Sequence, residues 1–463
     1  MLGRLPRAAS SMPVLRDRLA NRRGAVAVVL VLELGARGVG LVQPLAARHV
    51  VDGVGSARNL TGPIAVLGAL AVVGLLFNYV AYRQRGKLSE RFVLDLRKEA
   101  ARRTIFAPVP VVESRSAGDI LSRIGSDTTL VQHTVVKALV DLVVVPLTVV
   151  AGIVLMLFVD LSLAALVVGL LALAAVVELK VFGRLVRNTE RGQQHVGAMT
   201  GVVHRLLPAL RTVKASSMEH REAESFDREA GSAYRAGLRA AKTGALADTV
   251  AYASVDLTFL TVLAVGVLEV SAGTVGVGDL VAILLYVVYI QDPVESLTES
   301  ASRFSEGLAA LRRITELLEL RPETEALPPR AHVTGRPRKD GCAPGRYLRL
   351  DQVSFSYEGR EVLRDVTIEA RPGLTVLVGS SGAGKTTILS LVERFVEPDR
   401  GRVLLDGVDV REFPLPDLRR RVSYVEQEAP LLGDTIREAA TYGIDGLDDG
   451  ELQRVLASVG LDA

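Results

Sequence analysis

The stretch Gly379-Ser380-Ser381-Gly382-Ala383-Gly384-Lys385-Thr386-Thr387 is the most informative part of this 463-residue sequence. It fits the pattern G-x-x-x-x-G-K-[ST], which describes a P-loop that surrounds nucleotide phosphates. A short apolar run, 375–378, precedes it, and a helical pattern, 387–392, follows it. A strand, a glycine-rich loop and a helix are the context that the motif requires. We therefore predict a phosphate-binding loop at 379–387.

Each part of this loop has a chemical role in holding a nucleotide. Glycines allow the backbone to curl tightly, so that successive N–H groups point at one anion. The N-terminus of the following helix adds its partial positive charge. Lys385 is expected to reach the β- and γ-phosphates, and the Thr386 hydroxyl is expected to bind Mg²⁺. The loop thus predicts a nucleotide and Mg²⁺ as cofactors.

The composition indicates a membrane protein. Apolar residues make up 49% of the chain, and the mean hydropathy of +0.30 is high for a soluble protein. Trp is absent and aromatic residues make up only 5%, a mix that suits bundled transmembrane helices. About 20 helical residues span a hydrocarbon core. Windows of sufficient length predict six spans, at 25–47, 63–82, 136–159, 161–182, 246–270 and 279–296.

The distribution of basic residues predicts the orientation of these spans. Lys and Arg gather in the two long segments after the second and fourth spans, whereas the links at 160 and 271–278 contain neither. By the positive-inside rule, both termini and both long segments are cytoplasmic, in a multi-pass protein of the plasma membrane. Charges in these segments recur at helical spacing, so the membrane helices are expected to continue into the cytoplasm.

Charge and cysteine content exclude several classes of function. The formal net charge is only +3, and the basic residues lie beside apolar runs, which argues against a nucleic-acid partner. The single cysteine, Cys342, excludes an intrachain disulfide framework and a Cys-rich metal site. No signal peptide is apparent, because the first span lacks an end that resembles a cleavage site.

Ionisable residues inside the predicted spans are expected to face the bundle interior or water, because they are costly in lipid. Glu33 and Arg37 are four residues apart and are expected to neutralise each other. Asp256 has no obvious local partner, so it either lines a substrate cavity or bonds to a neighbouring helix. Asp141 and Asp248 complete the set.

The pattern changes after the last span. A helical stripe continues from 303 to 320, and Pro and Gly then interrupt all regular pattern over 321–346, which we interpret as a linker. From Leu348 the apolar residues alternate with period two, as in strands, and 401–410 is a second strand-like run with a turn at Asp406-Gly407. The predicted division is a membrane domain at 1–320, the linker, and an incomplete α/β P-loop domain at 347–463.

With these features together, the chain resembles an ABC transporter of the exporter type, a half-transporter with six spans fused to a nucleotide-binding domain. The resemblance implies that the nucleotide is ATP. Val353-Ser354-Phe355-Ser356-Tyr357 is similar to the A-loop, which implies that Tyr357 stacks on adenine; the alternative is an aromatic of the strand core. Val422 to Gln427 is similar to the strand that ends in the Q-loop, which implies that Gln427 contacts Mg²⁺ and the attacking water. Lys385 and Gln427 would then be the catalytic residues.

The membrane half carries matching motifs. Gly118 to Asp127 resembles the first coupling helix, 212–226 resembles the second, and Gly276 to Ala282 resembles the start of the sixth span. The family works as a homodimer or a heterodimer, so a second half-transporter is the expected partner, with a substrate that the sequence does not identify. The bias toward Ala, Val, Arg and Gly is typical of a high-GC bacterium, which implies the inner membrane.

Three motifs of the family's nucleotide-binding domain do not occur in these 463 residues. They are the signature loop, the apolar run that ends in Asp-Glu, and the switch histidine. We interpret the chain as a C-terminally truncated transporter, either a fragment or a frameshifted gene. The leading functional hypothesis is ATP-driven export by a dimer. The alternative is a nucleotide-binding but hydrolytically inactive membrane subunit, and a membrane-anchored P-loop kinase is the least favoured reading.

Overall fold

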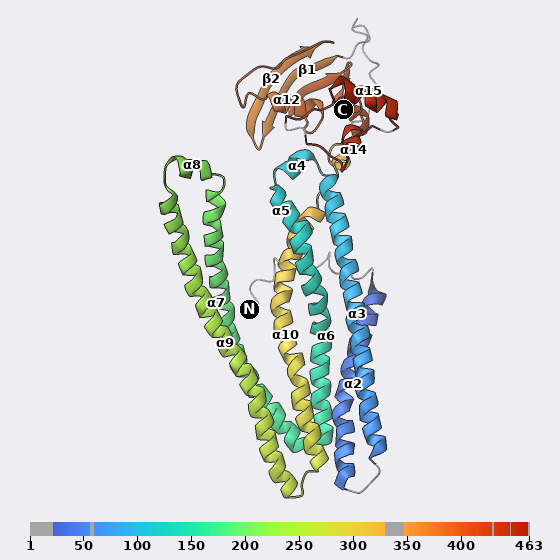
Figure 1. The fold of residues 1–463 in the computed structure, drawn as a ribbon, viewed down its shortest axis with the longest axis vertical. Coiled ribbons are helices and arrows are strands. Elements are labelled where there is room, and N and C mark those ends of the chain that lie inside the picture. Colours follow the sequence, from blue (N-terminus) through green and yellow to red (C-terminus); the bar gives the residue numbers. More distant parts are fainter. Residues whose placement is uncertain (1–21, 56–59, 329–346, 428–429, 445, 462–463) are drawn as a thin grey trace. The chain divides into compact units, whose positions relative to one another are not determined.

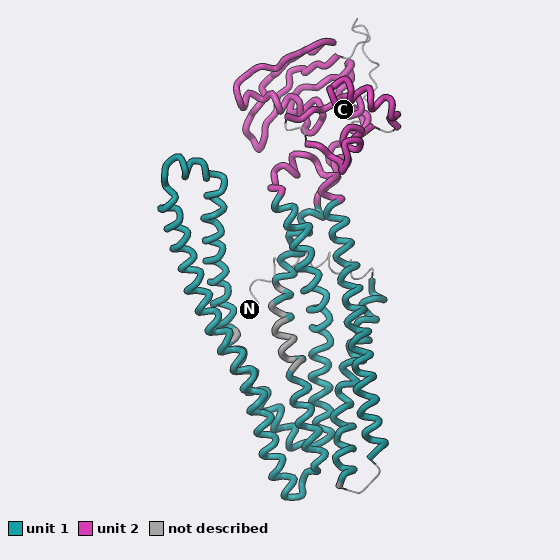
Figure 2. Tube along the Cα trace, in the orientation of Figure 1, with its two compact units in different colours: residues 1–101, 118–319 teal, residues 102–117, 320–463 magenta. Residues whose placement is uncertain are grey.

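A computed structural model describes residues 22–55, 60–328, 347–427, 430–444 and 446–461. The chain divides into two compact units, shown in different colours in Figure 2. Unit 1 consists of 1–101 and 118–319, and unit 2 consists of 102–117 and 320–463. Cys342 and most of the predicted linker lie outside the described residues.

Unit 1 is built from long helices (Figure 1). The sequence favours this, because its apolar stretches are long and rich in Ala, Val and Leu, and the helices continue through internal prolines such as Pro44 and Pro146. Its elements are α2 (Arg23–Gly55), α3 (Thr61–Ile105, whose end belongs to unit 2), α5 (Ala117–Ser122), the π-helical turn η2 (Arg123–Asp127), α6 (Thr128–Val159), α7 (Leu161–Leu206), α8 (Leu210–Ala215), α9 (Glu219–Ser271) and α10 (Val277–Leu318).

The predicted membrane spans coincide with these helices. By length and composition, five of the described helices could cross a membrane, and they contain the first five predicted spans. The sixth predicted span corresponds to a shorter apolar stretch, Val277–Gln291, at the start of α10. The expected helical extensions are confirmed, since α3, α7 and α9 run for 45, 46 and 53 residues.

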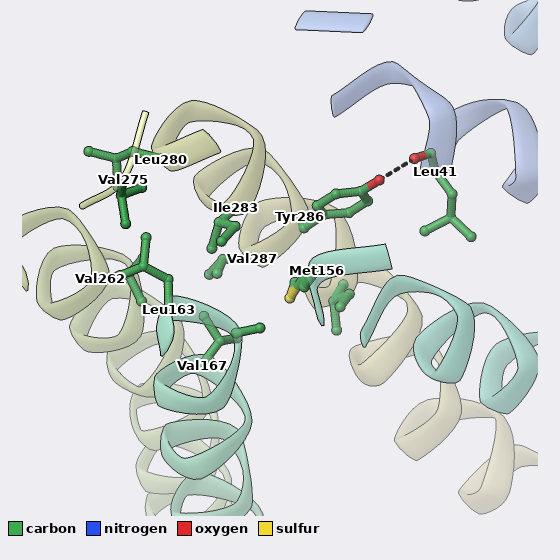
Figure 3. Packing of buried hydrophobic residues seen from close by; sticks show 12 residues of the cluster. Leu41, Met156, Leu163, Val167, Val262, Val275, Leu280, Ile283, Tyr286 and Val287 are labelled. Carbon is green, nitrogen blue, oxygen red and sulfur yellow. Dashed lines mark hydrogen bonds between the residues drawn. The ribbon is translucent and has the colours of Figure 1, made fainter. Parts of the chain in front are cut away.

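Two groups of helices make up unit 1. Helices α7 and α9 run side by side and are joined through α8, whereas α10 packs against α6 and α2 (Figure 1). A hydrogen bond of 2.8 Å from Asn188 Nδ2 to Thr243 Oγ1 links α7 to α9. The two groups meet in an apolar cluster, where Leu163 of α7 and Val262 of α9 pack with Ile283 of α10 (Figure 3).

Tyr286 anchors this cluster. Its ring is fully buried, and its hydroxyl donates a 2.8 Å hydrogen bond to the backbone carbonyl of Leu41 on α2 (Figure 3). A buried hydroxyl needs such an acceptor, because leaving it unpaired in an apolar environment costs free energy. The bond therefore fixes the position of α10 against α2.

The polar residues of the spans only partly follow the sequence expectation. Glu33 forms an ion pair with Arg85 of α3, at 3.0 Å, and the charge of its neighbour Arg37 acts on it as well. The interhelical pair is added to the expected local interaction, because tertiary packing brings a second cation to a buried carboxylate. Asp141 accepts a 2.6 Å hydrogen bond from Ser300 of α10. Asp256 is exposed on α9, and its predicted role stays a prediction.

Unit 2 contains a small antiparallel sheet with the order β2-β1-β3-β4. The predicted turn at Asp406-Gly407 is confirmed, with φ of 52° and 79°. The elements are α4 (Val109–Glu113), α11 (Glu323–Ala326), β1 (Leu348–Tyr357), β2 (Arg360–Ala370), α12 (Lys385–Val392), β3 (Arg400–Leu405), β4 (Val408–Asp409), the 3₁₀ turn η3 (Val410–Glu412), α13 (Leu415–Arg419), α14 (Ile436–Ala440) and α15 (Asp449–Ser458).

Helix α12 packs on this sheet through an apolar core. Ile388 and Leu391 of α12 meet Leu350 and Val353 of β1 and Val403 of β3, all buried. The period-two alternation of β1 supplies the sheet face, and the 3.6-residue period of α12 supplies the helix face. The core therefore fixes the helix that follows the glycine loop.

Two strand expectations are wrong. The run 375–378, expected as the strand before the glycine loop, forms no strand within the described part of unit 2, and Val378 is 90% exposed. The run 422–426 is likewise outside the sheet. A strand exists only through pairing with neighbours, and the antiparallel pairs of the described sheet join β1 to β2 and β3 and β3 to β4, without either of these two runs.

Candidate functional site

The glycine loop adopts a conformation that its sequence demands. Gly382 and Gly384 have φ of 82° and 87°, in the left-handed region where glycine carries no steric cost. A Cβ on Gly384 would lie 2.6 Å from Cδ2 of Leu363 in β2, so the loop also approaches the sheet too closely for a side chain. These two glycines shape the turn that starts α12.

The Lys385 side chain closes the loop. Its Nζ donates hydrogen bonds of 2.8 Å to the backbone carbonyls of both Gly379 and Ser380. Within the loop, the Ala383 N–H donates to the Ser380 carbonyl at 3.2 Å. The ammonium group therefore lies over the curled backbone of the loop. Its positive charge and the partial positive charge of the helix N-terminus would both attract an anion bound there.

The start of α12 provides the donors that a phosphate group needs. The first intrahelical bond runs from Ile388 N–H to the Gly384 carbonyl at 3.0 Å. The N–H groups of Lys385, Thr386 and Thr387 precede it and have no acceptor within the helix. This donor set, the glycine turn and the lysine fit a nucleotide phosphate chain.

The two adjacent threonines at the start of α12 differ in their exposure. Thr387 is buried beneath the helix, whereas Thr386 is exposed in the first turn. An exposed hydroxyl at this position fits Mg²⁺ that is also bound by phosphate oxygens and water. Within the described ranges, no group of three or more His, Cys, Asp or Glu residues could hold a metal by itself.

Tyr357 ends β1 at the tip of the β1–β2 hairpin. The two-residue turn Glu358-Gly359 follows it, with φ of 49° and 82°. Tyr357 is 41% exposed as a residue, and its ring packs edge-on against Phe355 with centroids 4.7 Å apart. Phe355 is the aromatic that enters the core. Tyr357 therefore keeps an accessible ring surface, as adenine stacking requires.

Gln427 lies at the end of the unpaired run 422–427 and is exposed. In the described structure, no hydrogen bond joins it to residues of the glycine loop. The run is held instead by Tyr424, whose ring packs edge-on against Phe395 at 5.8 Å, just beyond α12. The structure thus brings Lys385, Thr386 and the loop together, but leaves Gln427 outside their hydrogen-bond network.

Sequence reasoning missed a charged cluster at the other end of α12. Arg394 is fully buried, with 0% exposure, and Glu393 is 4% exposed. Burial raises the pKa of the Glu393 carboxyl above its ordinary value of 4.5, although the Arg419 charge acts in the opposite direction. Adjacent charges at a predicted helix end are typical of a solvated surface, so the sequence contains no signal for this burial.

The predicted coupling segments form helical turns in unit 1. The segment 118–127 forms most of α5 and the π-helical turn η2, and 212–226 covers α8 and the start of α9. Arg313 of α10 donates two hydrogen bonds, of 2.7 and 2.6 Å, to the buried Asp127 carboxylate. Arg123 pairs with Asp119 at 2.8 Å and with Glu316 of α10 at 2.5 Å. The first segment is therefore fastened to the end of α10.

Two known families match parts of this chain. Residues 26–294 match the family of the ABC transporter transmembrane region, which is more than half of the chain. Residues 363–463 match the family described as ABC transporter. The first match covers the membrane helices, and the second contains the glycine loop and Gln427.

Individual relatives are similar over most of the chain. The mitochondrial ATP-dependent permease MDL2 of Saccharomyces cerevisiae is 29% identical over 378 residues, which cover 81% of this chain and 48% of the relative. A multidrug resistance ABC transporter ATP-binding and permease protein of Lactococcus lactis is 27% identical, with 90% of this chain and 68% of the relative covered.

A third relative is the ATP-dependent lipid A-core flippase of Haemophilus ducreyi, which is 28% identical over 445 residues. This alignment covers 93% of the present chain and 73% of the flippase. The chain thus spans between about half and three quarters of the length of these relatives. From the match of the membrane region and of the nucleotide-binding segment, the chain belongs to the ABC transporter family, as a half-transporter of the exporter type.

Proposed function

We propose that this chain binds ATP and Mg²⁺ and takes part, as one half of a dimer, in ATP-driven export of a substrate across a bacterial inner membrane. Both termini are cytoplasmic in this proposal, and the partner is a second copy or another half-transporter. The observation that carries it is the glycine loop, where Gly384 and Lys385 form a phosphate cradle at the start of α12. The membrane helices in the same chain supply the transport path.

The residues of the chain have distinct roles in this site. Lys385 would exchange its bonds to the Gly379 and Ser380 carbonyls for phosphate oxygens, because charge-assisted bonds are the stronger ones. The backbone N–H groups of 379–387 would surround the phosphates, and Thr386 would hold Mg²⁺. Tyr357 would stack on the adenine, and Gln427 would position water. Bound ATP supplies the free energy of phosphoryl transfer.

The domain division is part of the proposal. The membrane domain extends over 1–320, the linker over 321–346 and the nucleotide-binding segment over 347–463. The segments 118–127 and 212–226 would pass the state of the nucleotide site to the membrane helices. The bidentate Arg313–Asp127 pair supports this role for the first segment, because it holds that segment to α10.

A second candidate is a membrane subunit that binds ATP without hydrolysing it. The observation that favours it is the position of Gln427, which is exposed and has no hydrogen bond to the glycine loop among the described residues. A water-positioning group contributes to hydrolysis only when it is within hydrogen-bond distance of the attacking water. Binding and hydrolysis must therefore be measured separately.

The test uses the full chain in lipid nanodiscs and a photoreactive ATP analogue. We expect Mg²⁺-dependent labelling that Lys385→Ala abolishes, while Lys242→Ala on α9 keeps the wild-type level. Equal labelling of wild type and Lys385→Ala would refute ATP binding at this loop. Phosphate release above the Lys385→Ala background supports the transporter ATPase, and labelling without phosphate release supports the second candidate.

A further inference from the structure

The C-terminal end of α12 has an unusual cap. The Arg394 N–H donates to the Leu391 carbonyl and the Phe395 N–H donates to the Ser390 carbonyl, at 3.2 and 2.8 Å. This pair of bonds is a Schellman motif, whose left-handed position is usually glycine. Here the position is Arg394, with φ of 53°. A non-glycine residue persists in this conformation only where its surroundings hold it there.

The contacts of the Arg394 side chain explain why arginine, and not glycine, occupies this position. Its guanidinium donates to Glu397 Oε1 at 2.7 and 3.0 Å and to the Phe413 carbonyl at 3.1 Å. It also donates to the backbone carbonyls of Leu327 and Pro328, at 3.3 and 2.9 Å. The buried charge is therefore satisfied from three separate parts of unit 2, as a buried arginine requires.

A second arginine holds the same distant segment. Arg419, at the end of α13, forms a bidentate pair with Glu323 at 2.7 and 2.8 Å. Its guanidinium lies 4.9 Å from the centre of the Phe395 ring, next to Arg394 in the chain. Planar, two-bond pairs of this kind fix direction as well as distance. We call Arg394 and Arg419 the arginine clamp, and the residues 323–328 that they hold the docked segment.

The docked segment is the chain that continues from α10. Helix α10 ends at Leu318, and α11 begins five residues later at Glu323. The docked segment is also fixed to the end of α3, since the Glu323 N–H donates to the Phe106 carbonyl at 2.6 Å. Arg103 donates to the Leu320 carbonyl at 3.2 Å. Backbone and side-chain bonds thus hold this short segment from several sides.

We propose that the arginine clamp is a mechanical link, in which Arg394 and Arg419 are positioning residues that transmit movement of α12 to α10. This inference rests on the proposed ATP binding at the glycine loop. Helix α12 has the phosphate cradle at one end and the clamp at the other, and its eight residues span about 12 Å. Because a short helix moves as a rigid rod, displacement of its start by phosphate also displaces its capped end. The covalent path through 319–322 carries that displacement into α10, separately from the segments 118–127 and 212–226.

The test compares two readouts in the full chain, with Cys342→Ser and spin labels at Arg312→Cys on α10 and Glu224→Cys on α9. One readout is labelling by the photoreactive ATP analogue, and the other is the ATP-induced change in the distance between the spin labels. Arg419→Gln breaks the bidentate pair with Glu323. Arg394→Gly removes the buried guanidinium group and places at the helix cap the glycine that is usual there. The matched control is Arg420→Gln, since Arg420 is the exposed residue directly after α13, and its side-chain hydrogen bonds among the described residues go only to Pro416 and Asp417 of that helix.

We expect Arg419→Gln and Arg394→Gly to keep at least half of the wild-type labelling and to lose at least two thirds of the ATP-induced distance change. Arg419→Lys should lose part of the ATP-induced distance change, because lysine keeps the positive charge but cannot form the two parallel hydrogen bonds of a guanidinium group. Arg420→Gln should behave as wild type. A full distance change in labelled Arg419→Gln overturns the link, as does a wild-type chain that is labelled but does not move. A wild-type chain without labelling overturns the proposed function and the link with it.

Discussion

Residues 348–357 and residues 374–378 of unit 2 are both rich in apolar side chains, yet only the first group forms a strand. β1 finds β2 directly after a two-residue turn and β3 on its other edge, so its apolar face is covered by α12. Residues 374–378 have no neighbour within the described sheet, and Leu374, Val376 and Val378 are exposed. An apolar pattern indicates that a segment could be a strand, but only available partners make it one.

The largest expected effect comes from placing the same charge in each region. Val353→Asp in β1 puts an unpaired carboxylate at a fully buried position and should lower the free energy of unfolding of unit 2 by about 3–5 kcal/mol. Val376→Asp changes a side chain that is 66% exposed and should alter it by less than about 0.5 kcal/mol. Local hydrogen exchange of the full chain in nanodiscs measures both. Equal losses in the two variants would mean that 374–378 is paired in solution.

A smaller effect is expected at the glycine loop, which directly follows residues 374–378 in the chain. Gly384→Ala forces a Cβ into a left-handed residue and toward Leu363 of β2, at a cost of about 1–3 kcal/mol. We expect strongly reduced labelling by the photoreactive ATP analogue. Gly86→Ala in α3 is the control, because nothing lies within 4 Å of the added Cβ. Normal labelling of Gly384→Ala would show that the loop does not need this conformation.

The smallest effect concerns the Glu393 carboxyl. Glu393 lies two residues before Phe395, whose ring packs against Tyr424 in the unpaired run 422–427. Burial raises its pKa, so the folded state binds this proton more tightly than the unfolded state does. The stabilising contribution of the bound proton is complete below pH 4.5 and is lost as the pH rises through the raised pKa. Glu393→Gln should therefore gain stability relative to wild type as the pH rises. Thermal melts followed by circular dichroism at several pH values measure this, and a difference that is independent of pH would contradict it.

The sequence predicted features that depend on local pattern. The membrane helices follow from long apolar stretches, and the Asp406-Gly407 turn follows from residues that tolerate positive φ. The glycine loop follows from a motif whose steric demands are encoded in its own residues. In each case, the information lies within a few turns of helix or a single hairpin.

Features that depend on distant partners could not be predicted. Glu33 pairs with Arg85, 52 residues away, and Arg394 binds carbonyls more than 60 residues away. The failure of 375–378 to form a strand has the same origin, because pairing is decided by other segments. The periodicity of a single sequence does not indicate which distant residue will pair with a buried charge. It also does not indicate which segment will pair with a given strand.

The packing of α7 against α9 has a consequence for the order of assembly during synthesis. These helices follow each other in the chain with only the short α8 between them, and they contact each other more than any other part of unit 1. Contacts between neighbours in sequence form quickly, since little loop-closure entropy opposes them. The main partners of α10, namely α6 and α2, are much earlier in the chain, although α10 also contacts α9. We therefore expect the α7–α9 hairpin to fold as a unit as soon as α9 is made, and the α2–α6–α10 bundle to close last, when α10 returns to helices inserted long before it.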